Sequence, residues 1–244
     1  MSNKKNWQIA ILILVIAVAG YYFYNEFYHS PKPKEQNRQE ANLDLDQFFE
    51  FKVVRQDLTE DQIDDYRQRF DRDIGQVLAN PDHFNFSALN NMAMIKRVLH
   101  DFEGARDIWE YISLKRPKNS LSFYNLGSLY AEEFKDNQKA EENYLKCLEN
   151  SKGESGNEQY YRAVVDFYTY YYPEKKKQIE RILLDALNQK EYKNSQDLMA
   201  LLATYYQNNG QLDKALEYWQ KILKLDPGNE GVRREIERIK GKNF

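Results

Sequence analysis

The sequence feature that most constrains the fold is an internal period of about 35 residues. Ala105 and Ala140 are 35 positions apart, and Ala215 follows 75 positions after Ala140, which leaves room for one further unit. Apolar residues recur at helical spacing around these alanines, and glycine and proline are scarce, with 10 and 6 in 244 residues. The period therefore indicates stacked helical hairpins, because one hairpin cannot bury its apolar faces without neighbours.

The clearest unit covers residues 196–229, with a turn between its two predicted helices. Its apolar and small residues resemble the pattern of the tetratricopeptide repeat (TPR), a helix–turn–helix unit of about 34 residues. The matching positions are Met199, Leu202, Ala203, Tyr206, Gly210, Ala215, Trp219 and Pro227. The resemblance implies an all-α fold, a right-handed α-solenoid of TPR-like helical hairpins, and binding of a protein or peptide partner.

Three further units fit the same pattern less completely. Residues 86–119 match well, although Lys96 replaces the usual Tyr and His100 replaces the turn Gly. Residues 120–152 match with one residue more than the pattern, which we expect in the turn around Asp136. Residues 156–194 form a degenerate unit with two helical patterns, separated by a break at Pro173.

We expect capping segments at both ends of a repeat domain over residues 43–244. Residues 229–241 form an amphipathic helix, which can seal the last hairpin. Near the front, Thr59 to Gln62 reads as a capping box, which begins a helix that ends before Asn80. This helix could be the second helix of a decayed first repeat, with Leu43 to Val53 as its helical partner.

Residues 1–24 have a different character from the repeats. Trp7 to Tyr24 is an apolar run that is long enough to span a bilayer when its aromatic ends lie in the interfaces. It predicts one N-terminal transmembrane helix before the repeats. Lys4 and Lys5 precede the run, so the positive-inside rule places the N-terminus in the cytoplasm and the repeat domain outside the cell membrane.

A secretory signal peptide is the alternative interpretation of the same segment. Ala17 to Ala19 provides a small-residue cleavage site after a short apolar core. The protein would then be secreted or periplasmic after cleavage. Residues 25–42 are polar and contain two prolines, which is typical of a linker.

The composition argues against several functions. The net charge of −3 disfavours a nucleic-acid binder, which needs a surplus of cations. Cys147 is the single cysteine, so it can form no intrachain disulfide. The three histidines lack the spacing of metal ligands, and no catalytic motif is present. We expect no enzyme activity and no cofactor.

The resemblance implies that a peptide binds the concave face, along the first helices of successive hairpins. The residues that this places in the groove are Asn90, Met94, Arg97, Tyr124, Asn125, Ser128, Glu132, Arg162, Asp166, Thr204, Gln207 and Asn208. Some TPR domains grip a C-terminal carboxylate with a Lys/Asn/Arg clamp. Only Asn125 and Arg162 fit that clamp, because Asn90 and Met94 stand where it wants Lys and Asn.

The sequence thus predicts a membrane-anchored, non-catalytic interaction scaffold, acting in envelope assembly, secretion or folding. The alternative is a small-molecule or glycan-binding module that uses the tyrosine-rich degenerate unit. Its tyrosines are Tyr160, Tyr161, Tyr168, Tyr170, Tyr171 and Tyr172. The sequence leaves open whether the chain forms a homo-oligomer.

Overall fold

The computed structural model describes residues 45–80 and 83–241. All regular elements in these ranges are helical, which confirms the all-α fold. Asp46 to Phe244 form one compact unit. The predicted anchor and linker lie outside the described residues. Within the described ranges, no helix combines the length and the apolar character that crossing a membrane requires.

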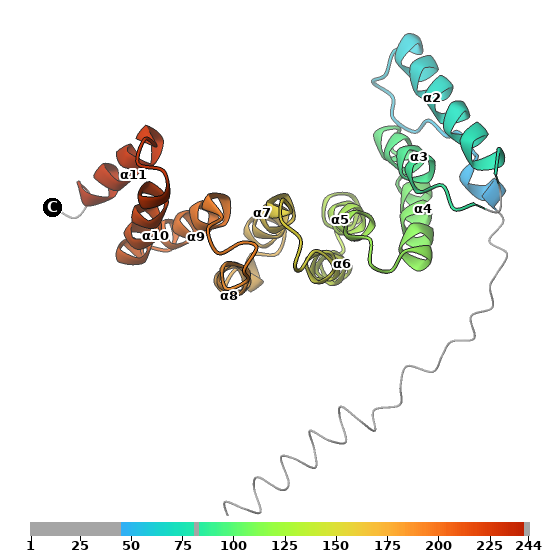
Figure 1. Cartoon of the computed structure of the whole chain (residues 1–244). Coiled ribbons are helices and arrows are strands. Elements are labelled where there is room, and N and C mark those ends of the chain that lie inside the picture. Colours follow the sequence, from blue (N-terminus) through green and yellow to red (C-terminus); the bar gives the residue numbers. More distant parts are fainter. Residues whose placement is uncertain (1–44, 81–82, 242–244) are drawn as a thin grey trace, which may run out of the picture. The chain divides into compact units, whose positions relative to one another are not determined.

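Consecutive helices pair into hairpins, and the hairpins follow one another along the unit (Figure 1). The pairs are α3 (Phe86–Val98) with α4 (Phe102–Lys115), α5 (Ser120–Leu129) with α6 (Asn137–Asn150), α7 (Glu158–Asp166) with α8 (Gln178–Leu187), and α9 (Gln196–Asn208) with α10 (Leu212–Leu225). Each second helix also packs against the first helix of the next hairpin. This is the arrangement of an α-solenoid, in which each unit buries its faces against its neighbours.

The helices begin at side-chain caps that the sequence supplies. Polar residues at the N-caps accept hydrogen bonds from backbone N–H groups that have no partner within the helix. Asn85, Asp101, Asn119, Asp136, Ser195 and Asn229 cap α3, α4, α5, α6, α9 and α11 (Glu230–Lys240) in this way. Pro173 begins a short 3-10 helix (Pro173–Lys175), which produces the predicted break before α8.

Helix α2 (Glu60–Leu78) packs against α3. The predicted capping box is confirmed: Gln62 N–H donates to Thr59 Oγ1 at 3.3 Å, and Thr59 N–H donates to Gln62 Oε1 at 2.9 Å. The expected helical partner before α2 is wrong. Leu45–Phe48 forms a 3-10 turn and residues 49–59 contain no helix.

The segment before α2 lies instead against the end of α3. The N–H groups of Val54 and Arg55 both donate to the carbonyl of Leu99 at 3.0 Å. Lys96, at the usual Tyr position, is buried and donates from Nζ to the carbonyl of Glu50 at 2.6 Å and to Asp101 Oδ2 at 2.8 Å. A buried cation needs such partners, and the segment supplies one of them through the carbonyl of Glu50.

The extra residue of the second hairpin lies in α5's continuation rather than in the turn, which corrects the prediction. In three hairpins, a residue with a left-handed backbone conformation lies five positions before the alanine that recurs in the repeat. His100 precedes Ala105, Lys135 precedes Ala140 and Gly210 precedes Ala215 in this way. The additional residue must therefore precede Lys135. Tyr130–Phe134 forms a π-helical turn (η2), in which the N–H of Lys135 donates to the carbonyl of Tyr130. A π-turn accommodates one residue without breaking the helix.

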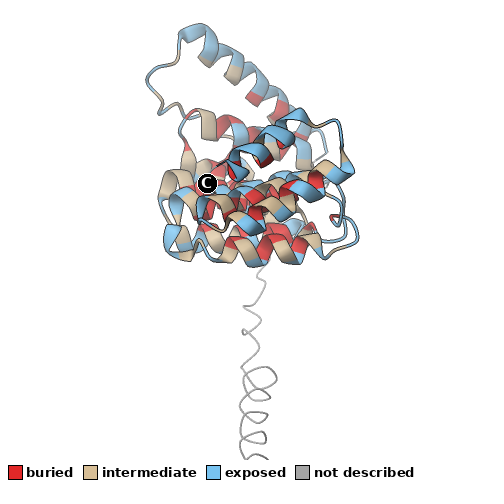
Figure 2. Ribbon diagram, turned by 90° about the vertical axis from the view of Figure 1, so that its left-hand side faces the viewer, coloured by how far each residue is buried: buried red, intermediate tan, exposed pale blue. Residues whose placement is uncertain are grey.

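The core runs along the facing sides of the helices, where the buried residues gather (Figure 2). Gly127 permits a close approach of α5 and α6, because a Cβ there would lie 2.8 Å from the ring of Tyr144. Tyr144 in turn packs on Phe167 of the next hairpin, with ring centroids 5.2 Å apart. Cys147 is buried nearby, and burial raises the pKa of its thiol to about 12, so it packs as a small apolar side chain.

Candidate protein-binding surface

The candidate surface is formed by the first helices of the hairpins, α3, α5, α7 and α9, with the turns that continue α5 and α7. Most of the predicted residues fall into two groups on it. One group joins α3 to α5 and η2 through hydrogen bonds. The other lines a cleft between α7 and α9.

An asparagine pair connects α3 and α5. Asn125 Nδ2 donates to Asn90 Oδ1 at 3.2 Å, and the same oxygen accepts a hydrogen bond from Trp109 Nε1 at 3.1 Å. The two asparagines are 35 residues apart and lie on the first helices of successive units. Their amides are used to hold the hairpins in register, and Asn90 Oδ1 has both its lone pairs engaged.

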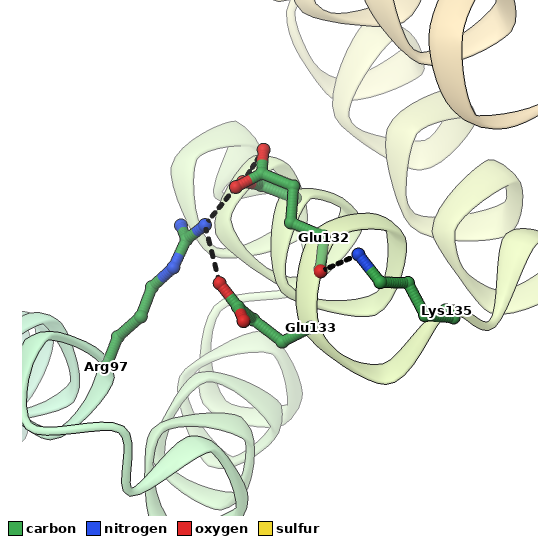
Figure 3. Close-up of polar contacts among 5 residues, drawn as sticks. Arg97, Glu132, Glu133 and Lys135 are labelled. Atoms are coloured by element: carbon green, nitrogen blue, oxygen red, sulfur yellow. Dashed lines mark hydrogen bonds and ion pairs between the residues drawn. The ribbon is translucent and has the colours of Figure 1, made fainter. Parts of the chain in front are cut away.

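An ion cluster lies about two turns further along, between α3 and η2, the continuation of α5 (Figure 3). Arg97 Nη2 lies 2.5 Å from Glu132 Oε2 and 4.0 Å from a carboxylate oxygen of Glu133. Ser128 Oγ donates to the other oxygen of Glu132 at 2.9 Å, and Lys135 Nζ donates to the Glu132 carbonyl. The side chains of Arg97 and Glu132 are 21% and 38% exposed, so a partner can still reach the cluster.

Two predicted groove residues are not open to a ligand. Asn125 and Ser128 are buried, each with 5% exposure. Tyr124 is half-buried, with its ring 5.4 Å from that of Tyr160. Met94 is exposed at 42%. The amide of Asn125 already joins two hairpins and is not presented to the groove.

The cleft between α7 and α9 has a volume of about 220 Å³. Four predicted residues line it: Arg162, Asp166, Thr204 and Asn208. Gln207 does not, because its side-chain oxygen accepts from Trp219 Nε1 at 3.2 Å. The sequence prediction missed Tyr170 and Lys176, which also line the cleft, and Tyr170 is 74% exposed. The dense run of tyrosines before Pro173 was the available signal for Tyr170.

Charges of both signs face this cleft. Arg162 and Lys176 provide two cations, and Asp166 provides one carboxylate. Partial desolvation raises the pKa of Asp166, and the nearby Arg162 opposes that rise. With amide and hydroxyl groups beside them, these side chains can pair with both the backbone and the charged side chains of a peptide.

The tyrosine-rich unit serves mainly for packing. Tyr160, Tyr161 and Tyr168 are buried, and Tyr168 Oη donates to Glu141 Oε1 at 2.8 Å. Tyr170 and Tyr171 are exposed, on the π-helical turn Phe167–Tyr171. The six tyrosines thus do not line one binding site, which removes the main argument for a glycan-binding module.

The described helices and their polar first-helix surface define the chain as a helical-repeat protein of the α-solenoid class. Family models described as tetratricopeptide repeat match residues 120–153 and 196–229. These matches support the TPR family for the chain. They coincide with the hairpins α5–α6 and α9–α10.

Solved structures similar to the chain include three described as follows. YrrB, a TPR protein with an unusual peptide-binding site, is 14% identical over 70% of this chain and 83% of its own, with a TM-score of 0.47. MamA is 20% identical over 66% of this chain and 86% of its own, with a TM-score of 0.46. TTC0263, a TPR protein of Thermus thermophilus, is 16% identical over 71% and 90%, with a TM-score of 0.46. No protein with a curated description matches the chain significantly.

Proposed function

We propose that this chain is a non-catalytic protein–protein interaction scaffold that binds a peptide segment of a partner along α3, α5, α7 and α9. The observation that carries the proposal is the cleft between α7 and α9, where Arg162, Asp166, Thr204 and Asn208 meet from two successive first helices. The TPR matches, one of which includes α9, support a binding surface built from the same helices in each unit.

The chemistry of the surface favours a segment of mixed charge. The cleft offers two cations and one carboxylate, whereas the cluster at Arg97 offers one cation and the two carboxylates Glu132 and Glu133. A partner with an acidic group at the cleft and a basic group near Glu132 would complement both. The exposed Met94 and Tyr170 supply apolar contacts beside the charged groups.

A photo-crosslinking experiment tests this assignment. A benzophenone amino acid replaces Thr204 in the cleft, and in a matched protein it replaces Lys139, which is exposed on the second helix α6. We expect a discrete crosslinked partner only from position 204, and we expect Arg162→Glu or Asn208→Ala to reduce its yield. Equal crosslinking from both positions, or a yield that neither substitution changes, would contradict the proposal.

The location of the scaffold is part of the proposal. The apolar run before Tyr24, preceded by Lys4 and Lys5, supports a single-pass anchor with the repeats on the outer side of the cytoplasmic membrane. There the scaffold would serve envelope assembly, secretion or folding. A reporter fused after Phe244 tests the orientation: activity of a cytoplasm-dependent reporter contradicts it, and activity of an export-dependent reporter supports it.

A further inference from the structure

A second cleft lies away from the first-helix surface, between the second helices α8 and α10. Its volume is about 470 Å³, roughly twice that of the cleft between α7 and α9. Leucines from both helices line it: Leu184 and Leu187 from α8, and Leu225 from the end of α10. Leu225 is 44% exposed, so apolar surface in this cleft is in contact with solvent. A volume of this size can take more than one apolar side chain of a partner.

The rim of the cleft is basic. Lys193, Lys221 and Lys224 line it, and no Asp or Glu is among its lining residues. Lys221 Nζ is 2.7 Å from Glu217 and 4.3 Å from the centre of the Tyr218 ring, so it is held by its own helix. Neither Lys193 nor Lys224 forms an ion pair with any residue in the described ranges. Two exposed ammonium groups beside an apolar floor therefore lack counter-charges within the described structure.

The neighbouring groove between α6 and α8 shows that a rim of cations without carboxylates is not a general feature of the second helices. That groove has a volume of about 200 Å³, and two carboxylates, Glu149 and Asp185, line it together with Lys152 and Arg181. Its charges balance, whereas those of the cleft between α8 and α10 do not. The basic rim is a property of the last hairpin and its junction with α8.

We propose that the cleft between α8 and α10 is a second docking site, which binds an acidic peptide segment carrying apolar side chains. Charge complementarity selects the acidic partner, because carboxylates near Lys193 and Lys224 would supply the missing counter-charges. The apolar floor takes the hydrophobic side chains. Asn188 and Asn194 also line the cleft and can both donate and accept hydrogen bonds, which suits a peptide backbone better than an acyl chain. The cleft shares no lining residue with the cleft between α7 and α9.

An array of 15-residue peptides tests the proposal with the purified full chain. The peptides combine Leu or Phe at varied positions with Glu and Asp elsewhere, and each has a matched peptide in which Lys replaces the acidic residues. We expect a subset of the acidic peptides to bind, their lysine counterparts not to bind, and binding to weaken as salt is raised.

Charge-reversal variants locate the binding. Lys193→Glu combined with Lys224→Glu should weaken the binding of the selected acidic peptides at least tenfold, and Leu225→Gln should weaken it without changing its salt dependence. All three side chains are exposed, so the folded helices should be retained, as circular dichroism can verify. The matched control combines Lys152→Glu with Arg181→Glu in the neighbouring groove and should leave binding unchanged.

Several outcomes would overturn the proposal. The first is that none of the acidic peptides binds, and the second is that acidic and basic peptides bind equally well. The third is that the control variant loses peptide binding as much as Lys193→Glu with Lys224→Glu does. Vesicles of phosphatidylglycerol and phosphatidylcholine form a further arm. If these vesicles bind the chain in a manner that Lys193→Glu with Lys224→Glu abolishes, while no peptide binds, the cleft recognises a lipid surface instead. Loss of binding only in Arg162→Glu would assign the peptide to the first-helix surface.

Discussion

Single residues fix how closely the helices approach and which polar groups are buried between them. Gly127 stands at the small position of the repeat pattern, directly against the ring of Tyr144. Asp73 on α2 is buried, and its Oδ2 accepts no hydrogen bond from the described residues. Both residues lead to predictions that depend on one side chain and its immediate contacts.

Gly127→Ala should destabilise the fold by about 1–3 kcal/mol, the usual cost of overpacking a core. The new Cβ would lie 2.8 Å from the Tyr144 ring, which is itself buried and packed on Phe167. Gly75→Ala is the matched control, because Gly75 is in the interior of α2 with no atom within 4 Å of an added Cβ. It should stabilise the protein by about 0.5–1 kcal/mol. Urea unfolding measures both, and a neutral Gly127→Ala would disprove the close contact.

Asp73→Asn should change how stability depends on pH. Desolvation raises the pKa of Asp73, so the folded state holds its proton more tightly than the unfolded state. The stability that this preference for the protonated Asp73 contributes is therefore fully present below about pH 3.9, the ordinary pKa of an Asp side chain. It is lost as the pH rises through the raised pKa of the folded state. Replacing the carboxyl by an amide removes this loss.

The measurement is urea unfolding of the wild type and the variant at steps from about pH 3.5 to 7. Relative to the wild type, Asp73→Asn should gain stability as the pH rises across this window. Asp71→Asn removes the same charge from an exposed position of α2 and should show no such gain. Parallel pH profiles for the wild type and Asp73→Asn would rule out a raised pKa.

At the scale of the elements, the turn between paired helices decides where each hairpin reverses. The hairpin α9–α10 uses Gly210 with φ of 73° for the left-handed residue, while α3–α4 and α5–α6 use His100 and Lys135 at φ of 63° and 57°. The element η2 precedes the turn at Lys135 and adds a residue before it. These three hairpins thus share the turn geometry although different residues adopt it, whereas α7 and α8 are joined through the 3-10 turn at Pro173.

Gly210→Ala should cost about 1–2 kcal/mol, the penalty of a left-handed conformation for a residue with a Cβ. No atom lies within 4 Å of the added Cβ, so the cost is one of backbone conformation alone. Gly228→Ala provides the comparison, because Gly228 lies in a turn without a positive φ and its Cβ would make one ordinary contact at 3.7 Å. Thermal or urea unfolding should show a loss only for Gly210→Ala, and equal effects would exclude the conformational explanation.

At the scale of the whole described unit, stability is distributed along the row of hairpins. Contacts run between neighbouring elements, so each hairpin depends mainly on the two beside it. Helix α11 covers the last face with Val232, Ile236 and Ile239, all buried. At the other end, α2 and the segment held by Lys96 cover α3.

Ile239→Ala should destabilise the C-terminal end by about 2–5 kcal/mol, because Ile239 is fully buried. The loss should be local, since a row of hairpins transmits stability through nearest neighbours. Native-state hydrogen exchange should show reduced protection in α9, α10 and α11 and little change in α3 and α4. Lys240→Ala is the exposed control. A uniform loss of protection from α3 to α11 would show that the unit unfolds as a single cooperative body.

The repeat could be predicted from the sequence, since its period, its small residues and its turn glycine follow from the local requirements of a helical hairpin. The sequence also determined the capping box at Thr59 and the break at Pro173, which depend on near neighbours in the chain. Four of the predicted groove residues, Arg162, Asp166, Thr204 and Asn208, do line one cleft.

The path of the chain between hairpins and the contacts between them followed only from the tertiary structure. The structure placed the extra residue in the π-helical turn η2, and it placed the segment before α2 in an extended path against Leu99. It buried Asn125 and gave its amide to Asn90, and it brought α8 and α10 together around a basic cleft. These features join residues that lie about 35 or more positions apart, or depend on how one helix meets the next. A repeat pattern specifies the hairpin, but the side chains that meet between hairpins are set by packing, which local periodicity does not encode.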